Sequence, residues 1–222
     1  MIFYHGSPKK LESLPSVTNG DTGKRHYKSP NGKLLPSITT VLSHFKKDII
    51  QEWRNRVGET EANRISKQAS NRGTNVHTLC EKYLNNEPMY FRGAFPDALE
   101  MFNSIKPELH RINNIHYQEC GLYSTHLGVA GRVDCIAEFD GVLSVIDFKT
   151  SRKVKTKDMI EDYFMQETFY ALAYEELIGN PIHQIVTIMA VEHDKPLVFI
   201  EETKNWIVPL VECVTDYKRI YK

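Results

Sequence analysis

The stretch Gly131–Lys149 constrains the fold of this chain more than any other part of the sequence. It consists of two apolar runs joined by Asp140-Gly141. This dipeptide is a strong signal for a two-residue β-hairpin, because a type I′ turn needs positive φ at both central residues. With such a turn, Phe139 faces Val142, and the pairing of the two strands can be counted outward from there.

Counting five more pairs back from the turn predicts that Asp134 lies directly opposite Asp147. Directly opposed Cβ atoms are about 4.5–5.5 Å apart, and the two-residue period of a strand puts Lys149 on the same face. Two opposed carboxylates within apolar strands repel each other and are costly to bury. Lys149 supplies one compensating charge, and a divalent cation such as Mg²⁺ or Mn²⁺, which suits carboxylate oxygens, would supply more.

This trio of Asp134, Asp147 and Lys149 has two interpretations. One is a buried ion-pair network with only a structural role. The other is a metal site for phosphodiester hydrolysis, in which a cation polarises a phosphoryl oxygen and lowers the pKa of attacking water. The lysine would then hold the nucleophile or stabilise the developing negative charge. The metal interpretation explains more of the segment.

Four other residues gain significance only beside this trio. Glu119 lies on the preceding predicted strand and can reach the same face after a turn near 124–128. Gln166 and Tyr170 are four residues apart on a predicted helix and therefore share one face. His77 lies within an earlier predicted helix. Taken alone, each residue has a more common role at a surface or in a core.

Hydrophobic periodicity predicts helices first, then strands, a long helix and further strands. The expected elements are a hairpin at 26–38, helical patterning to about 68 with Ser37 or Thr39 as N-cap, helices at 72–85 and 95–108, strands at 115–123 and 129–148, an amphipathic helix at 157–178 ended by Gly179, strands at 182–191 and 197–200, and a tail helix from about 205 despite Pro209. The fold class is therefore α/β, with a mixed central β-sheet flanked by helices and an N-terminal helical elaboration. We expect a single domain over residues 1–222, with a hairpin and helical elaboration at 1–110 and the core at 111–222.

The composition is that of an intracellular globular protein, and we expect a cytoplasmic location. Of the 222 residues, 41% are hydrophobic and 25% charged, and no stretch approaches the roughly 20 apolar residues of a membrane helix. The start lacks the apolar core of a secretory signal. The cysteine spacing predicts neither a zinc site nor an iron–sulfur cluster.

The net charge is zero, so no global basic field indicates a nucleic-acid partner. Positive charge nevertheless gathers in one short segment, at Lys149, Arg152, Lys153, Lys155 and Lys157. Such a run by itself is most often a solvated charged loop.

Taken together, these motifs resemble the RecB-like branch of the PD-(D/E)XK nuclease superfamily. The matching segments, in chain order, are Asn71–His77, Glu119, Gly131–Asp134, Val145–Ser151 and Gln166–Tyr170. The segment Pro36–Leu42 also resembles the start of phage exonucleases and of the mitochondrial genome maintenance exonuclease. DxK alone is a weak motif, whereas the ordered set of His, Glu, Asp, DxK and QxxxY is specific.

The resemblance implies a restriction-endonuclease-like core and a role for each matching residue. The residues implied to bind Mg²⁺ or Mn²⁺ are His77, Glu119, Asp134, Asp147 and the Phe148 carbonyl. Lys149 would assist the nucleophilic water, and Gln166 and Tyr170 would position Lys149 and the DNA backbone. Relatives with an iron–sulfur cluster use three C-terminal cysteines, and this chain has only Cys213 there, so no cluster is expected.

The implied substrate is DNA. Beside Gln166 and Tyr170, the residues expected to contact it are Arg72, Ser151, Arg152 and Lys153. The leading hypothesis is a metal-dependent exonuclease that prefers single-stranded ends, acting in DNA replication, recombination or repair, with the N-terminal helices as a wall or arch over the site.

Two alternatives remain open. The first is a structure-specific endonuclease or a nuclease subunit of a recombination complex, which would need a recombination or replication protein as partner. The second is a catalytically silent DNA-binding module. A phage origin, with action in the host cytoplasm, is suggested by the resemblance alone.

Overall fold

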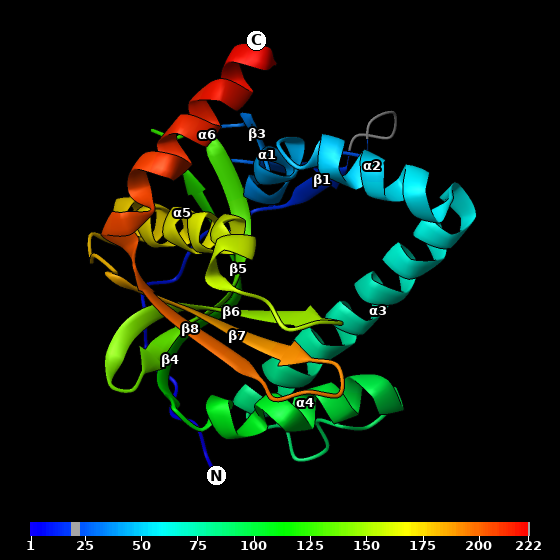
Figure 1. Ribbon diagram of the computed structural model, residues 1–222. Coiled ribbons are helices and arrows are strands. Elements are labelled where there is room, and N and C mark those ends of the chain that lie inside the picture. The colour runs from blue at the N-terminus through cyan, green and yellow to red at the C-terminus, as the bar shows by residue number, and fades with distance from the viewer. Residues whose placement is uncertain (19–22, 222) are drawn as a thin grey trace.

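The computed structural model describes residues 1–18 and 23–221, and its centre is a five-stranded mixed β-sheet (Figure 1). In spatial order, the strands are β4 (Ile112–Ser124), β5 (Val129–Phe139), β6 (Val142–Ser151), β7 (Gln184–Val191) and β8 (Leu197–Glu202). Neighbours are antiparallel except β6 and β7, which are parallel. A parallel pair needs a long crossover connection, and the helix α5 (Glu161–Ile178) supplies it.

Helices cover both faces of this sheet (Figure 1). Besides α5, the helices are α1 (Ile38–His44), α2 (Lys47–Val57), α3 (Glu59–Leu84), α4 (Pro96–Leu109) and α6 (Ile207–Ile220), with 3₁₀ turns at Lys157–Met159 and Thr203–Asn205. Side chains of α1, α5 and α6 form one hydrophobic core with the sheet, and those of α3 and α4 form a second. The predicted α/β class, a mixed sheet flanked by helices, is confirmed. No helix in the described ranges is both long and apolar enough to span a membrane.

The burial of β7 on both faces explains why its sequence is an almost continuous apolar run. Ile185 and Met189 belong to the core beside α5, whereas Val186 and Ile188 belong to the core beside α3 and α4. A strand that is buried on both faces needs apolar residues at every position. Within the buried stretch 185–191, the polar exception is Thr187, which is also buried and lies next to Asp147 in the parallel register.

The predicted β5–β6 hairpin register is confirmed from the turn outward. Asp140 and Gly141 have φ values of 52° and 80°, and the pairs run without a shift from Phe139 opposite Val142 to Cys135 opposite Ile146. The ladder ends there, one pair before the position at which we expected Asp134 to face Asp147.

Ahead of the main sheet, the predicted N-terminal hairpin is confirmed as β2 (Arg25–Lys28) and β3 (Leu34–Pro36). A third strand that was not predicted, β1 (Ser16–Thr18), pairs with β2. Ser37 is the N-cap residue of α1, but its hydroxyl does not bond a backbone N–H of the helix. It pairs with the Thr39 hydroxyl at 2.8 Å instead, so the predicted capping bond is absent.

The helical region from 37 to 85 is divided differently from the prediction. The expected first helix is split into α1, α2 and the start of α3, with Gly58 at φ 86° between α2 and α3. The expected break between 68 and 72 is wrong, because α3 continues through Gly73. At Gly73 the helix passes close to β6, where a Cβ would lie 3.6 Å from the Thr150 hydroxyl, so tertiary packing supports a helix that the local sequence leaves weak.

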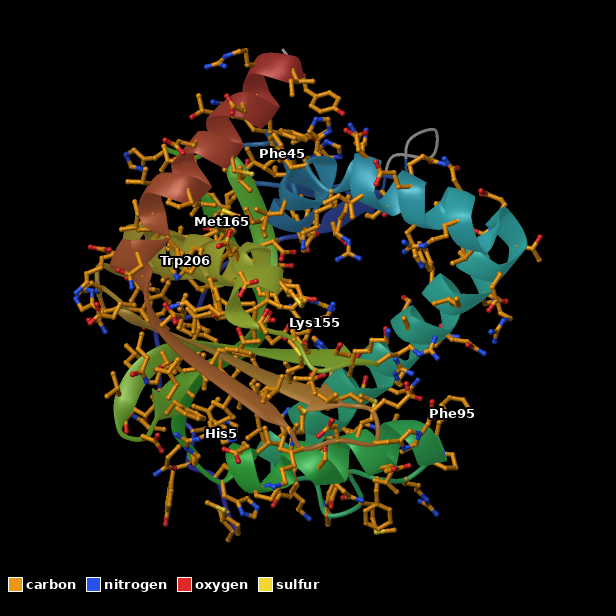
Figure 2. The ribbon with its side chains drawn as sticks, in the orientation of Figure 1. His5, Phe45, Phe95, Lys155, Met165 and Trp206 are labelled. Atoms are coloured by element: carbon orange, nitrogen blue, oxygen red, sulfur yellow. The ribbon has the colours of Figure 1, made fainter. Side chains whose placement is uncertain are left out.

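Residues 47–72, here called the arch, extend away from the sheet and return to it (Figure 1). α2 has no buried residue, and apart from Ala62 the buried residues of α3 lie at Val76 and beyond. Figure 2 shows that the space between the arch and the core stays open when side chains are drawn, with Lys155 beside it. The predicted arch-like elaboration is therefore present.

The helix α5 is correct in position but was predicted wrongly in character. Five consecutive residues, 167–171, are buried, so the helix is enclosed on most sides and is not amphipathic. It ends at Gly179 in the left-handed conformation, as predicted. Pro209 lies in the first turn of α6, where its missing N–H is not needed for a helical hydrogen bond.

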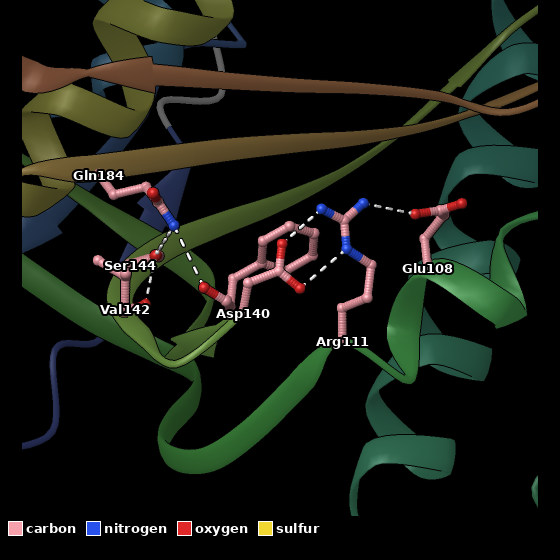
Figure 3. A network of polar contacts seen from close by, with 7 residues as sticks. Glu108, Arg111, Asp140, Val142, Ser144 and Gln184 are labelled. Carbon is pink, nitrogen blue, oxygen red and sulfur yellow. Dashed lines mark hydrogen bonds and ion pairs between the residues drawn. The ribbon is translucent and has the colours of Figure 1, made fainter.

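A polar network fixes the turn of the β5–β6 hairpin to α4 (Figure 3). Arg111 donates from Nε to Asp140 Oδ1 at 3.1 Å and from Nη1 to Glu108 Oε2 at 2.8 Å. Its guanidinium carbon also lies 4.3 Å from the centroid of the Phe139 ring. Arg111 thus connects the helix end, the ring and the turn at which the hairpin register begins.

We predict that Arg111→Ala lowers the free energy of unfolding by about 1–2 kcal/mol, because it removes a two-carboxylate network and a stacked ring contact. The measurement is chemical denaturation. Arg219→Ala is the control, since its pair with Asp216 is a largely exposed i,i+3 contact and should change stability by less than about 0.5 kcal/mol. Equal effects of the two substitutions would contradict the role of the network.

Candidate active site

A cavity of about 460 Å³ lies where α3, α5 and the N-terminal sheet meet the ends of β5 and β6. Its lining residues are Arg25, Tyr27, Ser37, Thr39, Gly73, Thr74, His77, Thr78, Glu81, Glu119, Arg132, Asp134, Lys149, Gln166 and Tyr170. Residues predicted from five separate motif segments therefore meet in one place.

Three of the predicted metal ligands form a compact group. One ligand atom each from His77, Glu119 and Asp134 lies within 4.8 Å of the other two. His77 Nδ1 is 3.3 Å from Asp134 Oδ2, and the same carboxylate oxygen accepts the Phe148 N–H at 2.9 Å. A strand, a neighbouring strand and a helix thus supply one oxygen or nitrogen donor each, a set that can hold a divalent cation.

Glu119 reaches this group from a strained backbone. Its φ is 49°, a value that is uncommon for a residue other than glycine and that concentrates at functional sites. The neighbouring pairs Gln118–Cys135 and Cys120–Val133 keep a regular register on either side. Arg132 Nε holds the Glu119 carboxylate at 2.9 Å, so the side chain is fixed at the cavity wall.

Asp147 belongs to a second group, beside the first. It forms a close ion pair with Lys149, and its Oδ1 accepts a hydrogen bond from Gln166 Nε2 at 3.2 Å. Lys149 Nζ lies 4.9 Å from the centroid of the Tyr163 ring. Asp147 is therefore in the predicted site but outside the compact donor group, and it orients the lysine.

The two carboxylates differ in their electrostatics because they share one lysine. Burial, followed by the attraction of Lys149 and the repulsion of Asp134, leaves the pKa of Asp147 raised to about 6. Burial acts in the same direction on Asp134, but His77 and Lys149 outweigh it and lower its pKa. Burial opposes the charge of Lys149, yet Asp147 and Asp134 raise its pKa. The lysine is therefore a charged hydrogen-bond donor at neutral pH.

The charges in the cavity leave room for a divalent cation. Four carboxylates, of Glu81, Glu119, Asp134 and Asp147, face three cations, Arg25, Arg132 and Lys149. The surplus negative charge is concentrated beside the compact donor group, and buried surplus charge is unfavourable unless it is paired. The donor set and the charge therefore both fit Mg²⁺ or Mn²⁺.

Tyr170 and Gln166 share one helix face, as predicted, and both line the cavity. Gln166 donates a hydrogen bond to Asp147. The Tyr170 ring packs closely against β5 at Gly131, where an added Cβ would be 2.7 Å from the Tyr170 Cε1 atom and 3.0 Å from Ile38 Cγ2. The glycine before the first aspartate thus makes space for the tyrosine.

Glu167 is a buried carboxyl for which the sequence analysis proposed no role. The Thr187 hydroxyl donates to its Oε1, while its Oε2 is buried and without a hydrogen-bond partner among the described residues. Burial, and then repulsion by Asp147, raise the pKa of Glu167 well above its usual range. It lies behind Asp147, because Thr187 is the neighbour of Asp147 in the β6–β7 register.

The residues predicted to contact DNA are divided between two places. Gln166 and Tyr170 line the cavity that also contains His77, Asp134 and Lys149. Arg72 does not line it, and Arg72 Nη1 lies 3.5 Å from Glu192 Oε2. Ser151 Oγ donates to the Lys153 carbonyl at 2.6 Å and so shapes the turn after β6.

A second cavity, of about 610 Å³, opens under the arch. It is lined by Trp53, Ile65, Ser151, Arg152, Lys153, Lys155, Glu192 and His193. The predicted basic segment after β6 therefore faces α2 and α3.

Several cavity residues were not among the predicted site residues, namely Arg25, Tyr27, Thr39, Thr78 and Glu81. Arg25 and Tyr27 come from a hairpin more than a hundred residues before the DxK motif, so only the folded chain brings them there. Glu81 had a weak local signal, because it follows His77 by one helical turn and shares its face.

We predict that Gly131→Ala lowers the free energy of unfolding by about 1–3 kcal/mol, because the methyl group overpacks Tyr170 and Ile38. Gly73→Ala is the matched control. Its Cβ meets ordinary contact distances, and alanine favours a helix interior by up to about 1 kcal/mol. Thermal unfolding of both variants is the measurement, and an unchanged Gly131→Ala melting temperature would contradict the close packing.

We predict that Glu167→Gln becomes stabilising relative to wild type as pH rises. Because the pKa of Glu167 is raised in the folded state, its protonation stabilises the fold. This contribution to the free energy of unfolding is complete below the unfolded-state pKa and is lost as pH rises toward the folded-state pKa. The neutral amide loses nothing over that range and can still accept the Thr187 hydrogen bond. Melting temperatures of the two proteins at pH 5 and pH 8 test this, and a difference that does not change with pH would refute it.

Comparison with known proteins is consistent with this site. Residues 52–198 match the model of the PD-(D/E)XK nuclease superfamily. The mitochondrial genome maintenance exonuclease 1 of Mus musculus is 25% identical over 197 residues, which is 82% of this chain and 54% of the mouse protein. The Homo sapiens protein is 25% identical over 170 residues, which is 72% of this chain and 45% of the human protein. The chain thus spans about half the length of these relatives.

Among solved structures, a candidate exonuclease from Eubacterium rectale aligns with a TM-score of 0.48 and 15% identity, covering 69% of this chain and 66% of that protein. The family match covers more than half of the chain and includes the histidine, both aspartates, the lysine and the Gln–Tyr pair. The chain belongs to the PD-(D/E)XK nuclease superfamily.

Proposed function

We propose that this chain is a metal-dependent DNA exonuclease that hydrolyses phosphodiester bonds from single-stranded ends. The observation that carries the proposal is the meeting of two groups in one cavity. One is the His77–Glu119–Asp134 donor set, and the other is the charged Lys149 paired with Asp147, whose carboxylate also accepts a hydrogen bond from Gln166. A structural ion-pair network alone would not need the histidine or the strained Glu119 backbone.

In this proposal, His77, Glu119 and Asp134 would hold Mg²⁺ or Mn²⁺, with Asp147 and the Phe148 carbonyl as the further ligands that the family resemblance implies. The chemistry that such a cation supplies is polarisation of a phosphoryl oxygen and a lower pKa for an attacking water. Gln166 donates a hydrogen bond to Asp147, and Asp147 forms an ion pair with Lys149. Together these contacts limit the positions that the Lys149 ammonium group can take. From there Lys149 stabilises negative charge that develops on the phosphate.

The arch supports the preference for single strands with free ends. The second cavity presents the basic residues Arg152, Lys153 and Lys155 opposite Trp53 of α2. Cations that track a backbone, combined with an aromatic ring on which a base can stack, are characteristic of single-strand binding. A strand that passes under the arch would reach the catalytic cavity along the end of β6, since Lys149 lines one cavity and Ser151 the other.

The name of the mouse and human relatives, an exonuclease of mitochondrial genome maintenance, supports an end-dependent activity in DNA replication, recombination or repair. In the proposal, residues 1–222 act as a single domain, in which 1–110 form the hairpin and helical elaboration that contributes His77, and 111–222 form the nuclease core. Action inside the cell, with or without a recombination or replication partner, is also part of the proposal. Both the phage origin and the absence of an iron–sulfur cluster stay predictions.

The test is a time course on end-labelled linear and closed circular single-stranded DNA with Mg²⁺, Mn²⁺ or EDTA. We predict metal-dependent loss of linear DNA only, with early mononucleotides or short oligomers. Lys149→Ala should lower the rate by about 100-fold or more, because it removes a charge aimed at the developing negative charge. Lys204→Ala is the control, since that lysine pairs with the exposed Glu202 outside both cavities.

The other outcomes separate the alternatives. Cleavage of circles into long fragments would replace the exonuclease by an endonuclease. DNA binding without cleavage under any metal, together with loss of folding in Asp147→Ala, would favour the silent binding module.

A further inference from the structure

We propose that Arg152 exchanges between Glu192 and a backbone phosphate of the bound strand, so that Glu192 limits how tightly the arch holds DNA. The inference rests on the proposed function, because it places a DNA strand under the arch. It assigns a role to Glu192, a residue for which the motifs suggest none.

Glu192 is an acidic residue in a basic surrounding. Among the described residues that line the cavity under the arch, it is the one carboxylate, beside Arg152, Lys153 and Lys155. A carboxylate at that place repels phosphate and weakens any DNA complex. Its presence therefore needs an explanation other than binding strength.

The Glu192 carboxylate lies between two arginines, on a backbone that is anchored to β6. Glu192 directly follows β7, and its backbone N–H donates to the Ser151 carbonyl at 2.9 Å. Its Oε2 atom is 3.5 Å from Arg72 Nη1 and 3.4 Å from Arg152 Nε. Both distances exceed those of a strong charge-assisted hydrogen bond, so neither contact is tight.

The two arginines differ in their freedom to leave. The side chain of Arg72, on α3, is 11% exposed, and its Nε is buried without a partner among the described residues. The side chain of Arg152, on the segment after β6, is 60% exposed. Arg152 can therefore turn toward a phosphate while Arg72 continues to neutralise Glu192, so the exchange leaves no isolated charge.

A purely structural role does not explain the contact with Arg152. The backbone bond from Glu192 to Ser151 already joins the end of β7 to the end of β6, and Arg72 already joins Glu192 to α3. A third connection from an exposed side chain adds little stability. It does keep a cation next to the cavity, ready to bind an anion.

The test is binding of a fluorescein-labelled oligo(dT) to the full chain in EDTA, followed by fluorescence anisotropy. We predict that Glu192→Gln binds about 2- to 5-fold more tightly, the range expected when an exposed ion pair no longer competes. Arg152→Gln should bind more weakly, and adding Glu192→Gln to it should give no gain. Arg72→Gln should also bind more weakly, because Glu192 then depends on Arg152 alone.

The control for the change in net charge is Glu202→Gln. Glu202 pairs with Lys204 and faces Gln184 at the opposite end of the β7–β8 ladder from Glu192. A gain equal to that of Glu192→Gln would overturn the exchange, because it would show a general effect of charge. A gain that persists in the Arg152→Gln background, or no gain at all, would also overturn it.

A structural role for Glu192 would appear separately, as a lower melting temperature of Glu192→Gln without tighter binding, and this too would overturn the exchange. Failure of the proposed function has a different signature, in which wild type neither binds the oligonucleotide nor cleaves linear DNA with Mg²⁺ or Mn²⁺. That result would remove both proposals, whereas cleavage by wild type without a gain in Glu192→Gln removes only this one.

Discussion

The structure depends on the placement of two buried carboxylates, Asp134 and Asp147, next to one buried lysine. One charge of Lys149 cannot balance both, so the pKa of Asp147 is raised while Asp134 is kept ionised by His77 and Lys149. Much around them serves this arrangement. The hairpin register brings the carboxylates together, α3 supplies the histidine, and α5 supplies the glutamine that orients Asp147. The charge that remains uncompensated is the physical reason why the site fits a divalent cation.

The arch adds a second constraint. α2 buries no residue, so its position comes from the helices at its two ends and not from a core of its own. Because α2 contributes no side chain to a core, charged and aromatic residues can occupy its inner side. The cavity under it combines Trp53 with the basic residues after β6 and with the acidic Glu192. In the proposed function, catalysis and strand binding would occupy adjacent cavities along the end of β6.

Much of the fold and the centre of the site could be predicted because the controlling signals are local. Asp140-Gly141 determined the hairpin register, and the register together with the two-residue strand period placed Asp147 and Lys149 on one face. The errors came where tertiary contacts outweigh local preference. α3 passes through Gly73 because it packs against β6. α5 was expected to be amphipathic, but helices and sheet enclose it on most sides. The β5–β6 ladder ends before Asp134, and the Asp134 carboxylate accepts a hydrogen bond from the Phe148 N–H instead.

The sequence by itself determined the turn, the strand register and the identity of the chemically important side chains, because short-range backbone geometry controls these. Only the tertiary structure decided which side chains share a cavity. Arg25 and Tyr27 arrive from a distant hairpin, Glu119 points inward because its backbone adopts a positive φ, and Glu167 becomes a buried carboxyl behind Asp147. Likewise, Arg72 and Arg152 look equivalent as basic residues, yet packing leaves one nearly buried and the other exposed beside Glu192. Burial and the proximity of distant segments depend on how the whole chain packs, and no local pattern carries that information.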